Sequence, residues 1–304
     1  MLARLQQFTT LGGLLVALLW GWGCVEAGHP GWGVAGAAFI VGGYAVVLGL
    51  EFTLLRLAHG DDPTPRATPA QLLRAWWGEV RTAPRVFCWR QPFRSRRWPD
   101  HLPPEGQGRR GLLLVHGFIC NRGIWNRWLQ RLHARGVPFV AVNLEPIFGS
   151  VDDYVATVEQ GVLQLERCTG VPPVIVAHSM GGLAVRRWLV EAGQAGDARI
   201  RHVVTIGTPH RGTWLARWAR GRNTREMRLD SPWQRLLGTR EPVQRQSRFT
   251  CFYSHCDNIV FPPAVATLPG ADNRHLPGVA HVAMVDHPAP WAEVQARLAE
   301  PIRP

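Results

Sequence analysis

Two long stretches near the start of the chain contain no charged residue. The first covers the 18 positions from Phe8 to Val25, and the second covers the 20 positions from Gly31 to Leu50. At about 1.5 Å per residue, each is long enough to cross the hydrocarbon core of a bilayer as an α-helix. Only Glu26 to Pro30 separates them. The pattern predicts a transmembrane helical hairpin over residues 1–57, with a tight turn on one side of the membrane.

Two other interpretations of the first stretch are weaker. It could be a signal peptide cleaved after the small-residue site Val25-Glu26-Ala27, or a buried helix of a globular domain. Glycine is frequent in both stretches, and it destabilises a helix in water but allows close helix packing in lipid. Even after cleavage, the second span would remain. The glycines stand at positions 12, 13, 21, 23, 28, 31, 33, 36, 42 and 43.

Beyond residue 110 the pattern changes to short apolar runs that alternate with amphipathic stretches. This alternation predicts an α/β fold with a mostly parallel sheet covered by helices. On such sheets, ligands bind beyond the carboxyl ends of the strands. The expected strands are 112–115, 139–142, 174–177, 202–206 and 249–254. The expected helices are 122–135, 152–168, 180–192 and 289–300.

The formal net charge is +12, and all 34 basic residues are arginine. Between residues 56 and 110 the arginines are interleaved with tryptophan and phenylalanine, a mixture typical of a lipid headgroup interface. We therefore expect a basic, aromatic-rich juxtamembrane linker over 58–110. Within it, residues 69–82 form either a short helix on the bilayer or a solvated connector with core-facing aromatics. A nucleic-acid partner is not expected, because no helix presents the required basic cluster.

The arginines also predict the orientation of the hairpin. Arg4 precedes the first span, Arg56 and Arg66 follow the second, and the turn between the spans contains no arginine. Because positive residues favour the cytoplasmic side, both ends of the hairpin should lie in the cytoplasm. The domain over residues 111–304 would then face the cytosol.

A serine stands where the third predicted strand gives way to a helix. The sequence Ala177-His-Ser-Met-Gly-Gly182 directly follows the apolar run 174–176. A strand, sharp turn and helix start of this kind holds a serine hydroxyl up for attack. Glycine at 181 suits the turn, because a side chain there would collide with the strand just left. Ser179 is therefore the expected nucleophile, although small residues and serine also suit an ordinary strand-to-helix connection.

A second turn could stabilise the negative charge that acyl transfer builds on an oxygen. The first predicted strand ends in His116-Gly117, and glycine lets the next backbone N–H point into the site. We expect the backbone amides of Phe118 and Met180 to form this oxyanion hole. His116 should shape the loop rather than act as a base, because it precedes the nucleophile strand.

The serine needs a base, and the base needs a carboxylate that fixes its tautomer. Asp257 follows the last predicted strand, and His281 lies in a turn before the final helix. We predict Asp257 as the acid and His281 as the base. Their competitors are expected to be surface or capping residues: His275, His287, Asp272 and Asp286.

Histidines and cysteines outside this set do not predict a metal site. Cys251 and Cys256 stand near His210 and His255, but no matching pair of ligands accompanies them. His178 is expected to pack locally beside the serine. The six cysteines should be free and mostly buried thiols, as is usual for a cytosolic domain.

Five pieces of the sequence resemble the α/β-hydrolase superfamily, especially its bacterial lipase and esterase branch, over about residues 111–300. They are His116-Gly-Phe118, Ala177–Gly182, Thr205-Ile-Gly-Thr-Pro-His-Arg-Gly-Thr213, Asp257 with the Ile-Val-Phe-Pro that follows, and His281. The resemblance implies an α/β-hydrolase fold with a cap or lid insertion, because the third piece is similar to the stretch that opens into the lid. Two features depart from the family: Ala177 replaces the usual glycine, and a transmembrane hairpin replaces a secretion signal.

The expected cap is the long arginine-rich segment from residue 211 to 248. Trp214 and Trp218 share one face at helical spacing, so they could contact an acyl chain or membrane lipid, or pack in a core. Ile119 and Trp125 could likewise line the acyl pocket or anchor the first helix on the sheet.

Together these patterns predict a membrane-anchored serine hydrolase of the bacterial inner membrane that cleaves hydrophobic carboxylic esters or lipids without a cofactor. Two hypotheses compete with it: a catalytically silent module that binds lipid or a partner at the membrane, and a basic nucleic-acid binder. The residues do not distinguish esters from thioesters, amides or polyesters, because the same triad hydrolyses all of them.

Overall fold

The computed structural model describes residues 1–302, and a six-stranded parallel sheet forms its centre. The strands are β1 (Leu112–Val115), β2 (Phe139–Ala141), β3 (Val174–His178), β4 (His202–Ile206), β5 (Phe249–Tyr253) and β6 (Asp272–His275). Their order is β2-β1-β3-β4-β5-β6, and every neighbouring pair is parallel. The five strands predicted from the sequence are present. The sixth, β6, was missed because its sequence is polar, as suits an edge strand that pairs on one side only.

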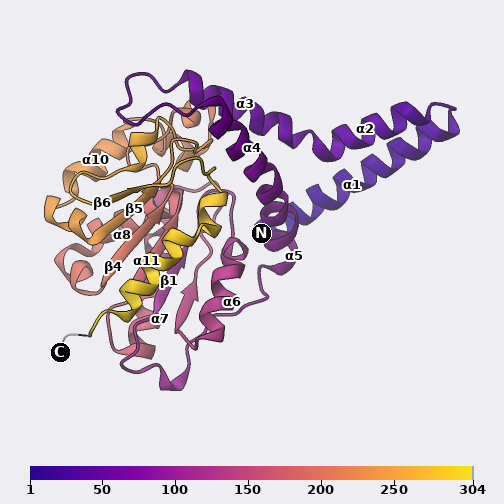
Figure 1. Cartoon of the computed structure of the whole chain (residues 1–304). Helices are drawn as coiled ribbons and strands as arrows, with labels where there is room; N and C mark the ends of the chain where they lie inside the picture. Colours follow the sequence, from indigo (N-terminus) through magenta and orange to yellow (C-terminus); the bar gives the residue numbers. More distant parts are fainter. Residues whose placement is uncertain (303–304) are drawn as a thin grey trace.

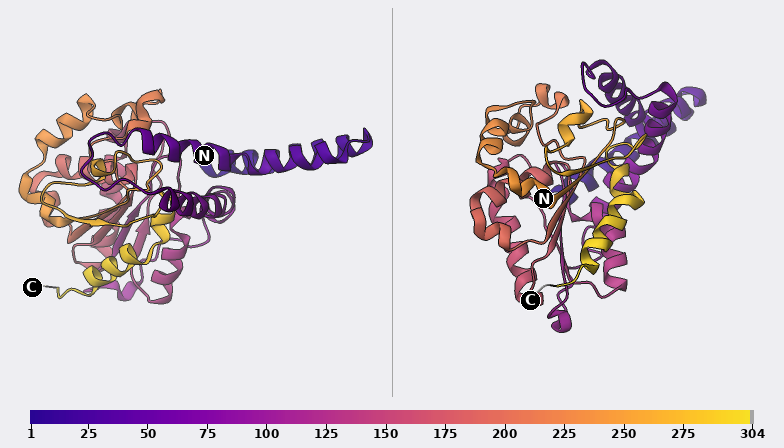
Figure 2. Two further views of the ribbon diagram at one scale, coloured as in Figure 1. Left: turned by 45° about the horizontal axis from the view of Figure 1, so that its top comes forward. Right: turned by 60° about the vertical axis from the view of Figure 1, so that its left-hand side comes forward.

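Helices cover both faces of the sheet (Figure 2, right). On one face lie α7 (Val155–Thr169) and α8 (Met180–Ala198), and on the other lie α6 (Asn126–Ala134) and α11 (Pro288–Ala299). Alternate residues of β1 point to opposite faces, because side chains alternate along a strand. Leu113 packs with α7 and α8, whereas Leu114 packs with α6 and α11. Burial on both faces explains why β1 is apolar throughout and why β3 is apolar up to its last residue, His178.

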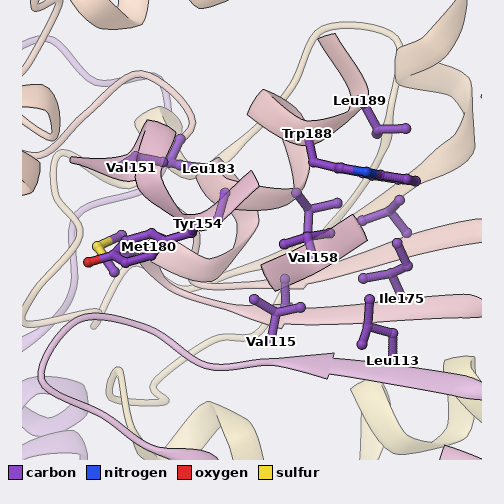
Figure 3. Close-up of a cluster of buried hydrophobic side chains, with 14 of the residues drawn as sticks. Leu113, Val115, Val151, Tyr154, Val158, Ile175, Met180, Leu183, Trp188 and Leu189 are labelled. Atoms are coloured by element: carbon purple, nitrogen blue, oxygen red, sulfur yellow. The ribbon is translucent and has the colours of Figure 1, made fainter. Parts of the chain in front are cut away.

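The core between the sheet and α7 and α8 shows this packing in detail (Figure 3). Val158 of α7 and Trp188 of α8 lie against the strand residues Leu113 and Ile175, and all four are buried. The helix predicted over 180–192 is the regular part of α8. Its geometry breaks at Gly193, which has φ 58°.

The N-terminal helices project away from this α/β body as a hairpin (Figure 1). They are α1 (Leu2–Glu26) and α2 (Pro30–Gly42). Helix α1 is long and apolar enough to cross a membrane, and only 6% of its apolar stretch is buried. A Cβ atom on Gly36 would lie 1.9 Å from the indole nitrogen of Trp20. Glycine at this position therefore lets α1 and α2 pack closely.

The second predicted span is not one helix, which corrects the expectation of two continuous spans. Helix α2 ends at Gly42, α3 (Tyr44–Leu57) follows, and their axes differ by 50°. At the bend, a Cβ atom on Gly43 would lie 2.6 Å from the carbonyl oxygen of Phe39. Only glycine fits there without a shift, and paired glycines are a common cause of kinks. The described residues thus contain one uninterrupted candidate span and one bent pair that qualifies only as a whole.

The segment between the hairpin and the sheet packs on the α/β body. Helix α4 (Pro69–Pro84) matches the predicted helix over 69–82 and begins with a capping box formed by Thr68 and Gln71. A π-helical turn (Arg85–Arg90) and the short helix α5 (Gln91–Arg94) follow. One apolar cluster joins α3 and α4 to the loops after β5 and β6: Phe52, Leu55, Ala75, Cys256, Phe261 and Ala280. Contacts therefore cross the expected boundary between linker and hydrolase domain.

The expected cap lies between β4 and β5 and contains α9 (Arg222–Glu226) and α10 (Pro232–Arg240). Two points within it are fixed to the body. The carboxylate of Glu226 accepts hydrogen bonds from the Ser150 hydroxyl and the Val151 N–H, at 2.6 and 2.7 Å. After α10, the buried carboxylate of Glu241 accepts hydrogen bonds from Arg186 of α8 at 3.0 and 3.1 Å. All six cysteines are free thiols.

Candidate active site

Ser179 stands at the turn between β3 and α8 with a left-handed backbone. Its φ is 55° and its ψ is −131°, a conformation that side-chain-bearing residues rarely adopt. Strain of this kind persists only where the surroundings impose it, and it concentrates at functional sites. Here the Ser179 N–H donates to the Ile206 carbonyl at 2.9 Å, and the Thr208 hydroxyl donates to the Ser179 carbonyl at 2.9 Å.

Two glycines after the serine make this turn sterically feasible. A Cβ atom on Gly181 would lie 2.5 Å from the carbonyl oxygen of His116, and one on Gly182 would lie 2.2 Å from the Thr208 hydroxyl. The obstruction at 181 is therefore the end of β1, not β3 as the sequence analysis expected. Ala177, where the sequences that this chain resembles usually have glycine, is buried within β3 and paired with Val115 of β1.

The loop after β1 lies directly beside the serine. A Cβ atom on Gly117 would lie 2.7 Å from Ser179 Cβ and 3.2 Å from its Oγ, so only glycine lets the loop pass this closely. Phe118 follows it. Met180 is the first residue of α8, and its N–H has no acceptor within the helix. The two predicted oxyanion donors thus come from adjacent turns that both border Ser179.

His116 shapes this loop through both of its ring nitrogens. Nε2 accepts a hydrogen bond from the Leu144 N–H at 3.0 Å, so Nδ1 carries the proton and donates to the Gly117 carbonyl at 2.8 Å. Burial lowers the pKa of His116 to about 4. A neutral imidazole therefore fixes the loop, in agreement with the structural role expected for it.

Asp257 and His281 form a buried pair. His281 Nδ1 lies 2.9 Å from Asp257 Oδ2. The other oxygen, Oδ1, accepts from the N–H groups of Ile259 and Val260 at 2.9 and 2.8 Å. Burial lowers the pKa of His281, but the charge and hydrogen bond of Asp257, together with the charges of Glu79 and Glu51, outweigh it, so the pKa is raised overall. Asp257 therefore orients the imidazole with its Nδ1 proton toward the carboxylate and leaves Nε2 free to accept a proton.

His178 links the serine turn to this pair. Its ring centroid lies 4.6 Å from that of His281, and its Nε2 is 3.4 Å from the His281 carbonyl oxygen. Burial and the neighbouring charge of His281 hold the pKa of His178 well below its usual value. His178 is thus a neutral packing partner of His281. Because it directly precedes Ser179, it connects the serine turn to the base.

Gly207, which directly follows β4, is a site residue that the sequence pattern did not indicate. Its φ is 56°, and a Cβ atom there would lie 3.0 Å from Asp257 Oδ2 and 3.1 Å from His281 Nδ1. The Thr205–Thr213 segment was noted for its resemblance, but it gave no reason for a glycine at this position. The reason is the space that the acid–base pair requires.

We expect Gly207→Ala to displace the Asp257–His281 pair and to lower kcat for ester hydrolysis at least about tenfold, because small misplacements of catalytic groups are costly. The measurement is kcat with a p-nitrophenyl ester, together with thermal unfolding. Gly238→Ala is the matched control, because Gly238 lies in α10 with open space around its Cβ position. Equal kcat in the two variants would contradict the steric argument.

The competing titratable residues are engaged elsewhere. His275 stacks on Tyr253 at 5.1 Å, and His287 Nδ1 accepts from the Ala289 N–H and so caps α11. Asp272 pairs with Arg274, and Asp286 pairs with Arg90 at 3.0 Å. His210 contacts Cys251 at 3.5 Å, whereas His255 packs on His275.

The residues predicted to bind substrate differ in their exposure. Ile119 and Trp218 are exposed, at 40% and 58%. Trp214 is half-buried and packs against Phe261 and Trp218, with ring centroids 5.7 and 4.7 Å apart. Trp125 is fully buried under β1, at 5.6 Å from Trp128. Of its two interpretations, the structure favours the anchoring of the first helix on the sheet.

Comparison with known proteins adds information on the fold. No protein-family model and no curated protein matches the sequence. Among solved structures, the chain is similar to the mature lipase BlEst2 of Bacillus licheniformis, with 17% identity, a TM-score of 0.55, and coverage of 64% of this chain and 95% of the lipase. It is also similar to lipase B of Aspergillus fumigatus, with 20% identity, a TM-score of 0.53, and coverage of 61% and 51%. The similarity, together with the parallel sheet and its flanking helices, establishes that the chain has an α/β-hydrolase fold.

Proposed function

We propose that the protein is a membrane-anchored serine hydrolase that cleaves carboxylic esters through an acyl-enzyme intermediate. One observation carries the proposal: a serine in a strained strand-to-helix turn directly follows His178, whose ring packs against His281 of a buried Asp257–His281 pair in which the imidazole is held in one orientation. The two fold relatives are both described as lipases, which supports the same class of reaction.

In the proposed reaction, Ser179 Oγ attacks the ester carbonyl while His281 Nε2 takes its proton. The imidazolium that forms is stabilised by Asp257. The backbone N–H groups of Phe118 and Met180 donate to the oxyanion, an interaction worth several kcal/mol of barrier lowering. Collapse of the tetrahedral intermediate releases the alcohol, which receives the proton from His281. Water then repeats the same steps on the acyl-enzyme, releases the acid and restores the serine.

We further propose that residues 1–57 insert in a bacterial inner membrane and that the hydrolase domain over 111–304 lies on the cytoplasmic side. The support is α1, the bent pair α2 and α3, and the position of the arginines outside the turn of the hairpin. An anchored enzyme with exposed Trp218 and Ile119 is suited to a hydrophobic ester or lipid substrate. The segment 211–248 is proposed as the cap that such a substrate contacts.

The substrate class is tested by acyl-length profiling of the detergent-solubilised full chain. We expect hydrolysis of p-nitrophenyl esters, with kcat/KM increasing from acetate toward longer acyl chains. A thioester and an anilide of the best acyl group, measured in parallel, determine the class of bond. Absence of turnover for every ester, with retained folding, would contradict the proposal.

The pKa of His281 predicts the pH dependence. Only the neutral imidazole can take the serine proton, and this pKa is raised above its ordinary value of 6.5. Protonation of His281 should therefore reduce kcat/KM as the pH falls, with half-maximal activity above pH 6.5 and a plateau at alkaline pH. The measurement is kcat/KM between pH 5 and 9. Activity that is constant or increases toward pH 5 would exclude His281 as the base.

A further inference from the structure

Helix α4 reaches the loop that carries the proposed base. Glu79 is only 1% exposed, and its two carboxylate oxygens accept hydrogen bonds from consecutive N–H groups. Oε1 lies 2.9 Å from the Val282 nitrogen, and Oε2 lies 3.1 Å from the Ala283 nitrogen. These are the two residues that directly follow His281. A single side chain from the N-terminal region thus fixes the backbone immediately after the base.

Helix α3 makes a second connection to the same place. Glu51 Oε2 accepts a hydrogen bond from Asn258 Nδ2 at 2.7 Å, and Asn258 Oδ1 accepts one from the His281 N–H at 3.2 Å. Asn258 directly follows Asp257 in the sequence. It therefore joins the acid loop, the base loop and α3 through one buried amide.

The burial of Glu79 has an energetic consequence. Within residues 1–302 this carboxylate has no ion pair with an arginine, and a buried carboxylate without a cation is unfavourable for folding. Burial raises the pKa of Glu79 to about 7 in spite of its two hydrogen bonds. An apolar side chain at this position would avoid the desolvation penalty. The gain in folding stability therefore does not explain why a glutamate stands here. Its contacts with the Val282 and Ala283 N–H groups and its charge near His281 do explain it.

The charged groups around the base agree with such a task. His281 is faced by Asp257, which it contacts, by Glu79 from α4 and by Glu51 from α3, and all three favour its protonated form. His178 faces it from β3 and is held neutral. The imidazolium that forms during the proposed reaction is therefore stabilised by two carboxylates besides the one that it contacts.

We propose that Glu79 and Glu51 are positioning residues, so that α3 and α4 hold the catalytic histidine loop in place in addition to connecting it to the membrane. The proposal rests on the proposed esterase function. It means that the N-terminal helices form a working part of the site, and that the acid and base loops are not held by the sheet alone.

The test compares Glu79→Gln with the wild-type full chain in detergent. A glutamine side chain has nearly the same shape but only one acceptor oxygen, and its NH₂ group would face the second N–H donor. We expect kcat to fall about 10- to 100-fold, as is usual when a group that orients an active-site ligand or base is lost. KM should change less than kcat. Loss of the Glu79 charge should also shift the acidic limb of the kcat/KM profile to lower pH.

Glu51→Ala should also lower kcat, but by a smaller factor than Glu79→Gln, because Glu51 reaches the His281 backbone only through Asn258.

Glu191→Gln is the matched control, because Glu191 makes an exposed ion pair with Arg187 on α8. Its kcat and pH profile should stay within about twofold of the wild type, as for most exposed pairs. The proposal is overturned if Glu79→Gln behaves like this control. It is also overturned if activity falls only in proportion to the folded fraction, measured by thermal unfolding, while the acidic limb does not move. Ser179→Ala in the same assay distinguishes failure of this proposal from failure of the esterase function. Activity in that variant would reject the serine esterase function, whatever the effect of Glu79→Gln.

Discussion

Ser179→Ala is expected to reduce kcat for p-nitrophenyl esters about 10⁶-fold, the loss typical of a removed serine nucleophile. The fold should remain intact, because the turn is held by backbone hydrogen bonds from the Ser179 N–H to Ile206 and from Thr208 to the Ser179 carbonyl. Neither bond uses the serine hydroxyl. Alanine also has the same Cβ atom, so it adds no steric conflict at φ 55°.

The measurement is ester turnover at saturating substrate, with thermal unfolding as the test of folding. Ser247→Ala serves as the control, because the Ser247 hydroxyl is exposed and bonds only the Gln244 carbonyl. We expect full activity in the control. Turnover in Ser179→Ala within tenfold of the wild type would exclude a covalent mechanism at this serine.

Asp257→Asn should be the second most damaging substitution, with a loss of about 10⁴-fold in kcat, because an amide beside the imidazole selects the wrong tautomer. The structure determines which way the amide would point. Asp257 Oδ1 accepts from the N–H groups of Ile259 and Val260, so the amide oxygen must stay there. The NH₂ group then faces His281 Nδ1 and donates to it. The imidazole proton moves to Nε2, which can no longer accept the serine proton.

A control variant and a pH series test the prediction for Asp257→Asn. Asp272→Asn is the control, since Asp272 pairs with Arg274 at the edge strand and should leave kcat within about twofold. Because the wrong tautomer belongs to the neutral imidazole, which is the form present at alkaline pH, the activity of the Asp257→Asn variant should not recover as the pH is raised from 7 to 9. Wild-type activity at neutral pH would show that another carboxylate orients His281.

Local patterns were sufficient for the parts of the site that depend on neighbouring residues. The serine turn follows from an apolar run, a serine and two glycines within one short segment, and the structure places Ser179 in that turn. Asp257 and His281 were predicted from the end of a strand, the turn before the last helix, and the order of serine, acid and histidine in the class that the sequence resembles. Asp257 follows β5 and His281 follows β6, and neighbouring parallel strands bring their carboxyl ends to one edge of the sheet. There His281 Nδ1 lies 2.9 Å from Asp257 Oδ2.

The missed features depend on contacts between segments far apart in the chain. Glu79 lies 203 residues before its partner Val282, and in the sequence it is the single acid of an amphipathic helix that could equally face lipid or solvent. The Gly43 bend divides a run that reads as one continuous span, because hydropathy does not register a steric contact with Phe39. Strand β6 has no apolar face, so the period-two signal that revealed the other strands is absent there.

A single labelling experiment tests most directly whether Ser179 acts together with the Asp257–His281 pair. The folded full chain is treated with a fluorophosphonate, and the adduct is located by peptide mass spectrometry in the wild type and in His281→Ala. We predict one adduct on Ser179 in the wild type and a labelling rate at least about 10³-fold lower in His281→Ala, since the serine hydroxyl is weakly nucleophilic without its base. An adduct on another residue, or equal labelling of Ser179 in both proteins, would show that Ser179 and His281 do not act together.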